Sequence, residues 1–401
     1  MRKIKLLLVG KGDSIFFTDY VRALKSCMDV EVDVYSPFAD KGNYTSRPFD
    51  AIYFDDLEKK RINHIKFISG LIRPLLQRKR FANFLKRNNK FYDIIHFKWI
   101  LPAWTLNPSE YRKYCTKVFA SFWGGELEKQ TLLRSHQLYC HTLGLFIEKV
   151  DGFINLGNNQ IYFKQFPKLR DKMSYGVYGS SIIEKIVSSE IGKNEAKEKM
   201  GIPQDSVTIM TGYSGKPMHR HIENIDAICT NPNFIKSKED ICFILPMTRD
   251  ATEEYIQLIE CKLKSYGAKY VLLKGKYLSE DDVVLLRKST DVILQTSEWD
   301  GLSSSIKESL AAGSIAVCGD WLHYELLTEK GFLFLKTRSI EDCAYIVYDI
   351  LGNRTKYAFF AENNKKIANK EFFWSECIKP WAECYKKALN VMASTRNSKN
   401  G

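Results

Sequence analysis

The sequence predicts an α/β protein with two domains, each built around a doubly wound parallel sheet. Short apolar runs alternate with helix-like stretches along the whole chain, which is the pattern of strands joined by crossover helices. The 401 residues are enough for two sizeable cores. A hydrophobic content of 45% with 27% charged residues is typical of a soluble globular protein.

The first half of the chain contains six apolar runs that we predict to be strands: 4–9, 30–35, 49–54, 92–99, 117–122 and 151–156. A helix is expected from Phe16 to Cys27. The turn between the first strand and this helix, Gly10-Lys11-Gly12, lacks the third glycine of a dinucleotide-binding motif. An NAD-dependent oxidoreductase is therefore disfavoured, and we interpret Gly10 and Gly12 as a tight turn that faces a cleft.

Three more residues of this half are candidates for the same cleft. His96 stands at the end of a predicted strand, although a lone histidine is more often a buried core residue than a catalyst. Gly124, in the turn Trp123-Gly124-Gly125-Glu126, leaves room for a ligand to approach the backbone. Glu126 either binds sugar hydroxyls or caps the next helix.

The second half repeats the alternation, with predicted strands at 207–211, 241–245, 270–273, 292–294, 315–318 and 333–335. Helices are expected at 253–266, after the cap Ser279, and at 340–351. Aromatic residues between Phe372 and Tyr385 mark terminal helices.

A loop rich in glycine and cations, Gly212–His221, follows the first of these strands and leads into a helix. Gly212 and Gly215 allow close approach, and the helix start offers free amides. We predict that Lys216 and Arg220 neutralise a diphosphate and that His219 lies beside it. A plain solvated helix cap is the alternative.

The stretch from Thr290 to Trp321 reads strand, loop, helix, strand, and it carries two acids, Asp300 and Glu308, with seven residues between them. The free amides near the helix start form a candidate anion seat, made of Gly301, Leu302, Ser303 and Ser304. Carboxylates beside such a seat suit sugar hydroxyls. A phosphate flanked by polyol groups describes a nucleotide sugar. Surface acids on an ordinary solvated helix are the alternative interpretation.

This stretch resembles the acidic motif of family 4 glycosyltransferases of the GT-B fold, in which two Rossmann-like domains face a cleft. Asp300 stands for the first glutamate of that motif, Glu308 for the second, and Leu310, Ala311 and Gly313 match its end. The runs Asp93-Ile94-Ile95-His96 and Trp123-Gly124-Gly125-Glu126 are similar to two other elements of the family.

The resemblance implies a retaining glycosyltransferase whose catalytic residues are Asp300, Glu308, Lys216 and Arg220. Asp300 would hold the donor sugar and Glu308 the ribose, while the two cations grip the pyrophosphate. The substrate would be a nucleoside diphosphate sugar, with no cofactor and no metal. In the family's glycine loop an arginine often stands where this chain has Tyr213.

The resemblance also sets the expected domain organisation. Residues 1–180 would form the acceptor-side domain and 181–375 the nucleotide-sugar domain. A C-terminal helix, 376–392, would cross back and pack on the first domain, and 393–401 would be a disordered tail.

The net charge of +13 is concentrated in the segment 61–90, which has nine basic residues, no acid and many apolar ones. We interpret it as one or two basic amphipathic helices broken at Pro74, which either lie on an anionic membrane or pack on their own sheet. No recognition motif for nucleic acid accompanies the charge.

The remaining features favour a cytoplasmic protein, peripheral on the inner face of the membrane if the basic segment binds lipid. The sequence has no apolar run of eighteen residues, so no membrane-spanning helix is expected. Its ten cysteines are scattered without CxxC pairs, which favours reduced thiols over disulfides or a zinc site. The charge then favours a lipid-linked acceptor, an intermediate of a bacterial surface glycan such as an O-antigen, a capsule or an exopolysaccharide.

Three other functions remain open. The loop Gly212–His221 also resembles that of the Fuc4NAc transferases, which are GT-B enzymes, so an inverting transferase is one alternative. A sugar-nucleotide epimerase on the same fold is a second. A non-enzymatic nucleotide- or glycan-binding protein is a third.

Overall fold

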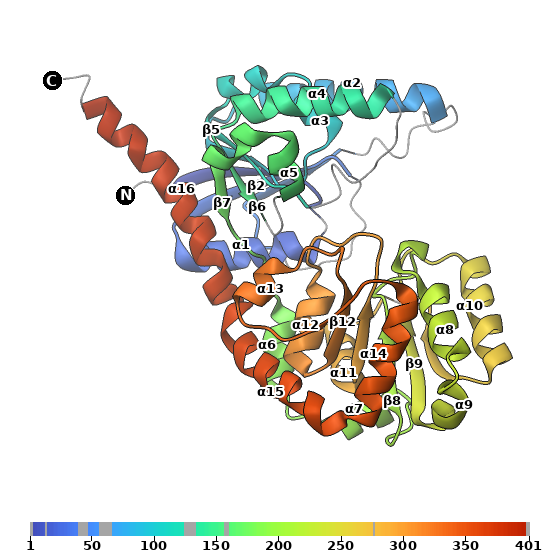
Figure 1. The fold of residues 1–401 in the computed structure, drawn as a ribbon. Helices are drawn as coiled ribbons and strands as arrows, with labels where there is room; N and C mark the ends of the chain where they lie inside the picture. The colour runs from blue at the N-terminus through green and yellow to red at the C-terminus, as the bar shows by residue number, and fades with distance from the viewer. Residues whose placement is uncertain are drawn as a thin grey trace. The chain divides into compact units, whose positions relative to one another are not determined.

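The computed structural model describes residues 3–12, 14–38, 47–55, 66–123, 134–155, 160–275 and 277–397 (Figure 1). The chain divides into two compact units, Met1–Gly179 with Trp374–Gly401, and Ser180–Phe373. Each unit has one sheet whose strand pairs are all parallel, with helices on both faces. The predicted fold class is therefore confirmed.

The first unit's sheet has the strand order β3-β2-β1-β4-β5-β6-β7. Its central strand β4 is buried on both faces, as a parallel sheet covered by helices requires. The order reverses between β1 and β4, so these two strands flank the switch point of this sheet. The strands are β1 (Ile4–Val9), β2 (Val30–Ser36), β3 (Ala51–Phe54), β4 (Tyr92–Phe97), β5 (Cys115–Ala120), β6 (Gly152–Asn155) and β7 (Met173–Tyr175).

Two separate cores cover this sheet. Helices α1 (Ile15–Cys27) and α16 (Trp374–Asn397) pack together on one face, where Trp381 and Tyr385 are fully buried. The other face carries α2 and a second apolar cluster around Phe81 and Trp104. Within its described residues this unit also contains α2 (Lys66–Asn88), α3 (Pro102–Thr105), α4 (Arg134–Lys149), α5 (Gln160–Gln165) and the 3₁₀ turns Pro108–Lys113 and Pro167–Lys172.

Helix α2 corrects one prediction, because it continues through Pro74. A proline inside a helix removes one intrahelical hydrogen bond. We attribute the continuity to the packing of the later turns, where Phe81 and Leu85 are buried against the sheet. The predicted tail from residue 393 also begins inside a helix, since α16 extends to Asn397, and 398–401 lie outside the described residues.

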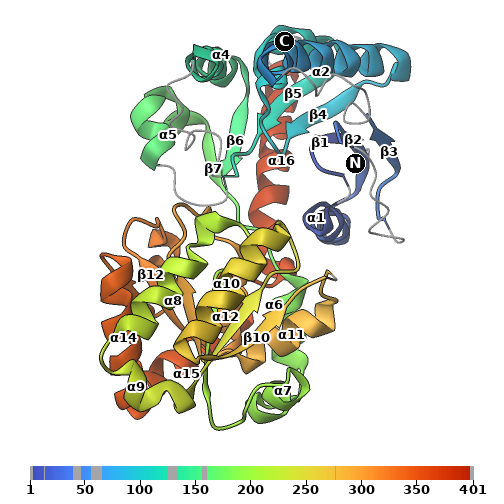
Figure 2. The same ribbon diagram turned by 90° about the vertical axis from the view of Figure 1, so that its right-hand side faces the viewer.

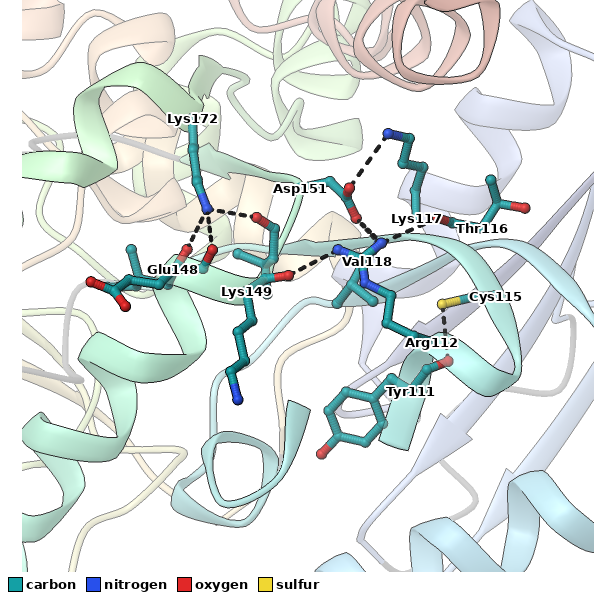
Figure 3. A network of polar contacts seen from close by, with 12 residues as sticks. Tyr111, Arg112, Cys115, Thr116, Lys117, Val118, Glu148, Lys149, Asp151 and Lys172 are labelled. Carbon is teal, nitrogen blue, oxygen red and sulfur yellow. Dashed lines mark hydrogen bonds and ion pairs between the residues drawn. The ribbon is translucent and has the colours of Figure 1, made fainter. Parts of the chain in front are cut away.

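A polar network lies at the end of this sheet where β5 begins (Figure 3). The Lys172 ammonium donates to the carbonyls of Ile147, Glu148 and Val150 at the end of α4, at 2.7 to 2.9 Å. A cation at this position satisfies carbonyls that a helix end leaves unpaired. The network is at the opposite end of the strands from the switch point, and we assign it a structural role.

The second unit's sheet has the order β10-β9-β8-β11-β12-β13, which reverses between β8 and β11. Because right-handed crossovers run in opposite directions from that point, α8 and α10 lie on one face and α11 and α12 on the other (Figure 2). The strands are β8 (Val207–Thr211), β9 (Ile241–Pro246), β10 (Lys269–Leu273), β11 (Val292–Gln295), β12 (Ile315–Gly319) and β13 (Leu335–Thr337).

The helices of this unit follow the sequence signals closely. The expected cap Ser279 forms a full capping box with Asp282 at the start of α11, and Gly313 ends α12 with a φ of +87°. The helices are α6 (Ser181–Ser188), α7 (Lys193–Lys199), α8 (His221–Thr230), α9 (Phe234–Ser237), α10 (Glu253–Tyr266), α11 (Glu280–Ser289), α12 (Ser304–Ala312), α13 (Glu325–Glu329), α14 (Ile340–Gly352) and α15 (Arg354–Glu371).

Candidate functional site

The candidate site of the second unit lies at the switch point of its sheet, where loop 212–220 follows β8 and loop 296–303 follows β11. The two loops contact each other directly. The Tyr213 hydroxyl donates to Asp300 Oδ1 at 2.9 Å, and the Glu298 amide donates to the Met218 carbonyl at 3.0 Å. The structure thus brings together the two motifs that the sequence places about eighty residues apart. Ligands of open α/β sheets bind at such a point.

The two glycines of loop 212–220 are required by packing within the protein. Gly212 has a φ of +62°, and a Cβ there would lie 2.6 Å from His221 Cε1. A Cβ on Gly215 would lie 2.2 Å from the Cβ of Ala251. Close packing against protein side chains accounts for both glycines, and their role in letting a ligand approach stays a prediction.

Two buried histidines hold loop 212–220 in place through hydrogen bonds. The nitrogens of His219 lie 3.0 Å from the hydroxyls of Ser214 and Ser297, so its ring links the two loops. His221 bonds the Thr211 hydroxyl and the Ser214 carbonyl. Burial lowers the pKa of His219 to about 3 and that of His221 to about 4, so both are neutral at physiological pH. His219 thus holds the loop in place as an uncharged group.

The two predicted phosphate-binding cations remain accessible. Lys216 is exposed, and its Nζ lies 3.7 Å from Asp250 Oδ2. Arg220 has a left-handed backbone, and its guanidinium lies 5.3 Å from the ring centre of Trp321. The indole of Trp321 is itself fixed by donating to the Ser297 carbonyl at 2.7 Å. The ring of Trp321 therefore packs against the Arg220 guanidinium. Trp321 was not among the predicted site residues.

Asp300 is held by three donors. Its carboxylate accepts from Tyr213, from Tyr324 at 2.5 Å and from the Ser303 amide at 2.9 Å. One amide of the predicted anion seat, that of Ser303, therefore already binds a protein carboxylate. Leu302 has a φ of +64°, which shapes the turn between Gly301 and α12, whose first residue is Ser304. Neither tyrosine was predicted, because the sequence gives no sign of which hydroxyls fold onto Asp300.

Glu308 is buried on α12 and forms an internal ion pair. Its carboxylate accepts from Arg287 Nε on α11 at 3.1 Å and from the Ser180 hydroxyl, just before α6, at 3.0 Å. Glu308 was predicted only as a ribose contact, and its pairing with Arg287 was missed. The sequence does hold a signal for this ion pair. Arg287 is a charged residue among the buried positions of α11, and a buried charge needs a partner.

Five residues of the first unit were predicted to line a cleft, and three of them lie within the described part of the chain. Gly10 and Gly12 are tight-packing positions, where a Cβ would lie 2.5 Å from the Phe17 ring and 3.0 Å from Ile52. His96 is fully buried, with Nε2 2.8 Å from the Ser121 hydroxyl and Nδ1 2.5 Å from the Tyr385 hydroxyl. Gly124 and Glu126 lie outside the described residues.

A buried lysine beside His96 was also missed. Lys98 directly follows β4 and is fully buried, and its Nζ lies 3.5 Å and 3.4 Å from the ring centres of Tyr20 and Trp381. No hydrogen-bond acceptor is found for this nitrogen among the residues that the structure describes. Burial holds the pKa of Lys98 well below its usual value.

Comparison with solved structures shows the GT-B fold of glycosyltransferases. A sucrose-phosphate synthase from Thermosynechococcus elongatus superposes with a TM-score of 0.72 at 12% identity, over 97% of this chain and 100% of that chain. HepE from Anabaena, in complex with UDP and glucose, gives 0.69 at 14% identity, over 96% and 100%. WaaG, a glycosyltransferase involved in lipopolysaccharide biosynthesis, gives 0.63 at 13% identity, over 95% and 99%.

Sequence comparison adds nothing to this result, because no family model and no curated protein matches the chain. Within the described part of the chain, every helix is too short or too polar to cross a membrane.

Proposed function

We propose that this chain is a glycosyltransferase that moves a sugar from a nucleoside diphosphate sugar to a hydroxyl acceptor. The observation that carries the proposal is the contact between loops 212–220 and 296–303, which carry the cations Lys216 and Arg220 and the acid Asp300 at the switch point of a GT-B domain. The similarity of fold to HepE, which was solved with UDP and glucose, supports a nucleotide-sugar donor.

Each proposed catalytic residue has a distinct task. Lys216 and Arg220 stabilise the charge that develops on the departing diphosphate, which is the main electrostatic demand of the reaction, and we propose that they do so without a metal ion. Asp300 binds hydroxyls of the donor sugar, and Glu308 binds those of the ribose. A carboxylate offers about four lone-pair sites, and the two contacts of Glu308 leave some of them for a ligand.

We further propose that the configuration of the sugar is retained. An inverting transferase needs a general base near the acceptor. His96 is a poor base for that purpose, because both ring nitrogens are bonded inside the first unit and burial lowers its pKa well below the usual value.

We propose that the acceptor is a lipid-linked surface-glycan intermediate and that α2 holds the chain on the cytoplasmic face of a membrane. On α2, Ile72, Leu75, Lys79 and Lys86 are exposed. Their spacing of three, four and seven residues places them on one stripe of the helix. An apolar end followed by lysines suits an anionic lipid surface.

A titration with nucleoside diphosphates tests the donor site. We expect Lys216→Ala and Arg220→Ala each to raise the Kd for the best-bound of UDP, GDP, CDP, ADP and dTDP by about tenfold, because each removes a charge-assisted phosphate contact. Lys236→Ala, an exposed lysine before β9 at the opposite end of the strand, is the control and should leave the Kd unchanged. Wild-type affinity in both site variants would remove the two residues from the site.

A further inference from the structure

We infer that Arg249 is a third cation of the donor-phosphate site and that the carboxylate of Asp250 competes with the donor phosphate for these cations. The inference rests on the proposed function and adds two residues to it. Both lie in the loop that follows β9, next to β8 in the sheet.

The loop of Arg249 is joined to loop 212–220. The Gly215 amide donates to the Arg249 carbonyl at 2.8 Å, and the α-carbon of Gly215 faces Ala251 with no room for a side chain. These contacts fix the backbone of Arg249 beside Gly215, which directly precedes Lys216. Its side chain is half-exposed and free to turn toward a ligand.

Two cations converge on Asp250. Its Oδ2 lies 3.7 Å from Lys216 Nζ and 3.6 Å from Arg249 Nε. An anionic oxygen held between an ammonium and a guanidinium has the surroundings that proteins give to a phosphate oxygen. Both pairs are loose and half-exposed, so solvent screens them and an incoming dianion can displace the carboxylate.

The backbone of Asp250 supports the idea of an internal competitor. Its φ is +63°, a left-handed conformation that non-glycine residues seldom adopt, and Asp and Asn tolerate it best. The strained residue is the one that aims an acid between the two cations. Strained backbone of this kind gathers at ligand-binding positions.

The charge of Arg249 reaches the site already described. Burial lowers the pKa of His219, and His221, Lys216 and Arg249 lower it further. Burial and Asp300 raise the pKa of Tyr213, and Arg249 opposes them. Arg249 and Lys216 thus act electrostatically on the same buried ring.

The consequence is a site whose affinity for diphosphate is limited by its own acid. Binding must replace the Asp250 carboxylate on two cations, and the displaced acid then repels the bound anion. Removing the acid should therefore tighten diphosphate binding, and removing Arg249 should weaken it. A nucleoside without phosphate should respond to neither change.

Calorimetric titration of the full chain with the nucleoside diphosphate that binds best, and with its nucleoside, tests this. We expect Arg249→Gln to raise the diphosphate Kd by about tenfold and Asp250→Asn to lower it by about threefold. Asn keeps the left-handed backbone accessible, so Asp250→Asn should fold normally. Matched controls are Arg354→Gln at the start of α15 and Asp240→Asn just before β9, both exposed and away from the loop.

Unchanged affinity in Arg249→Gln, or weaker binding in Asp250→Asn, overturns the inference and leaves the proposed function standing. Equal effects on the nucleoside and the diphosphate also overturn it, because the contact would then not be to phosphate. If the wild type binds none of the five diphosphates, the proposed function itself fails, and this inference fails with it.

Discussion

Lys98 is a fully buried lysine in the core of the first unit. Its ammonium group is surrounded by the faces of Tyr20, Trp381 and, at 5.2 Å, Tyr178. Aromatic faces attract a cation, but they do not replace the hydrogen bonds that water gives it. Burial holds the pKa of Lys98 well below its usual value, because the charged form loses its water. We therefore expect Lys98 to reduce the stability of the first unit.

Replacing Lys98 with methionine, of similar length, should stabilise the first unit by about 1–3 kcal/mol, the usual cost of an unsatisfied buried polar group. The gain should shrink as the pH rises toward the usual lysine pKa of 10.5. Below that value the unfolded chain binds a proton that the native state resists, so the wild type gains stability with rising pH and the variant does not.

Calorimetric melting of both proteins between neutral pH and about pH 10 measures this difference. Lys113→Met, at an exposed lysine, is the control and should leave the melting temperature unchanged. A lower melting temperature for Lys98→Met at all pH values would mean that the aromatic faces stabilise the charged form.

At the scale of elements, α2 carries the proposed membrane contact. Within α2, Arg78 pairs with Glu110 at 2.8 Å and Arg80 with Asp55 at 2.5 Å, so these two charges are partly satisfied inside the protein. Lys79 and Lys86 are exposed on the stripe that also holds Ile72 and Leu75. The two lysines are therefore the better test of lipid binding.

Reversing both charges, Lys79→Glu with Lys86→Glu, should weaken binding to vesicles containing anionic phosphatidylglycerol by about tenfold or more, since each basic residue near such a surface contributes about 1 kcal/mol. Vesicle sedimentation measures the bound fraction. The control Lys366→Glu with Lys370→Glu makes the same charge change on α15. Equal loss in both variants would indicate a general charge effect, and no binding by the wild type would end the proposal.

The elements themselves were largely predictable from the sequence. Apolar runs and caps located β1, α10 and α11 closely, because burial and capping are local requirements. The misses have tertiary causes. The break expected at Pro74 does not occur, and the short strand β7 was missed because its side chains are half-buried or exposed and show no apolar run.

For the candidate site, strand order made the meeting of the two loops predictable, and the side-chain contacts were much less so. Loop 212–220 and Asp300 meet because both follow strands beside the switch point, which strand order determines. The partners Arg287, Tyr324 and Trp321 were not predicted. Each reaches the site from another element, and a single sequence does not show which side chains will face one another.

For the whole molecule, the central claim is that a GT-B domain binds a nucleotide sugar at loops 212–220 and 296–303, with Glu308 on the ribose. Glu308 also pairs with buried Arg287, so a loss of activity after a single substitution could reflect lost structure alone. Replacing both partners, Arg287→Met with Glu308→Met, separates the two roles, because an apolar pair often restores stability where an ion pair is removed.

The most direct measurement is the release of nucleoside diphosphate from a panel of nucleotide sugars, with bacterial membrane lipids as the acceptor source. We predict release by the wild type, a fall of about tenfold or more in Glu308→Gln, and no recovery in the folded double variant, because the ribose contact is absent from both. Wild-type turnover by the double variant, or no release from any donor by the wild type, would contradict the account.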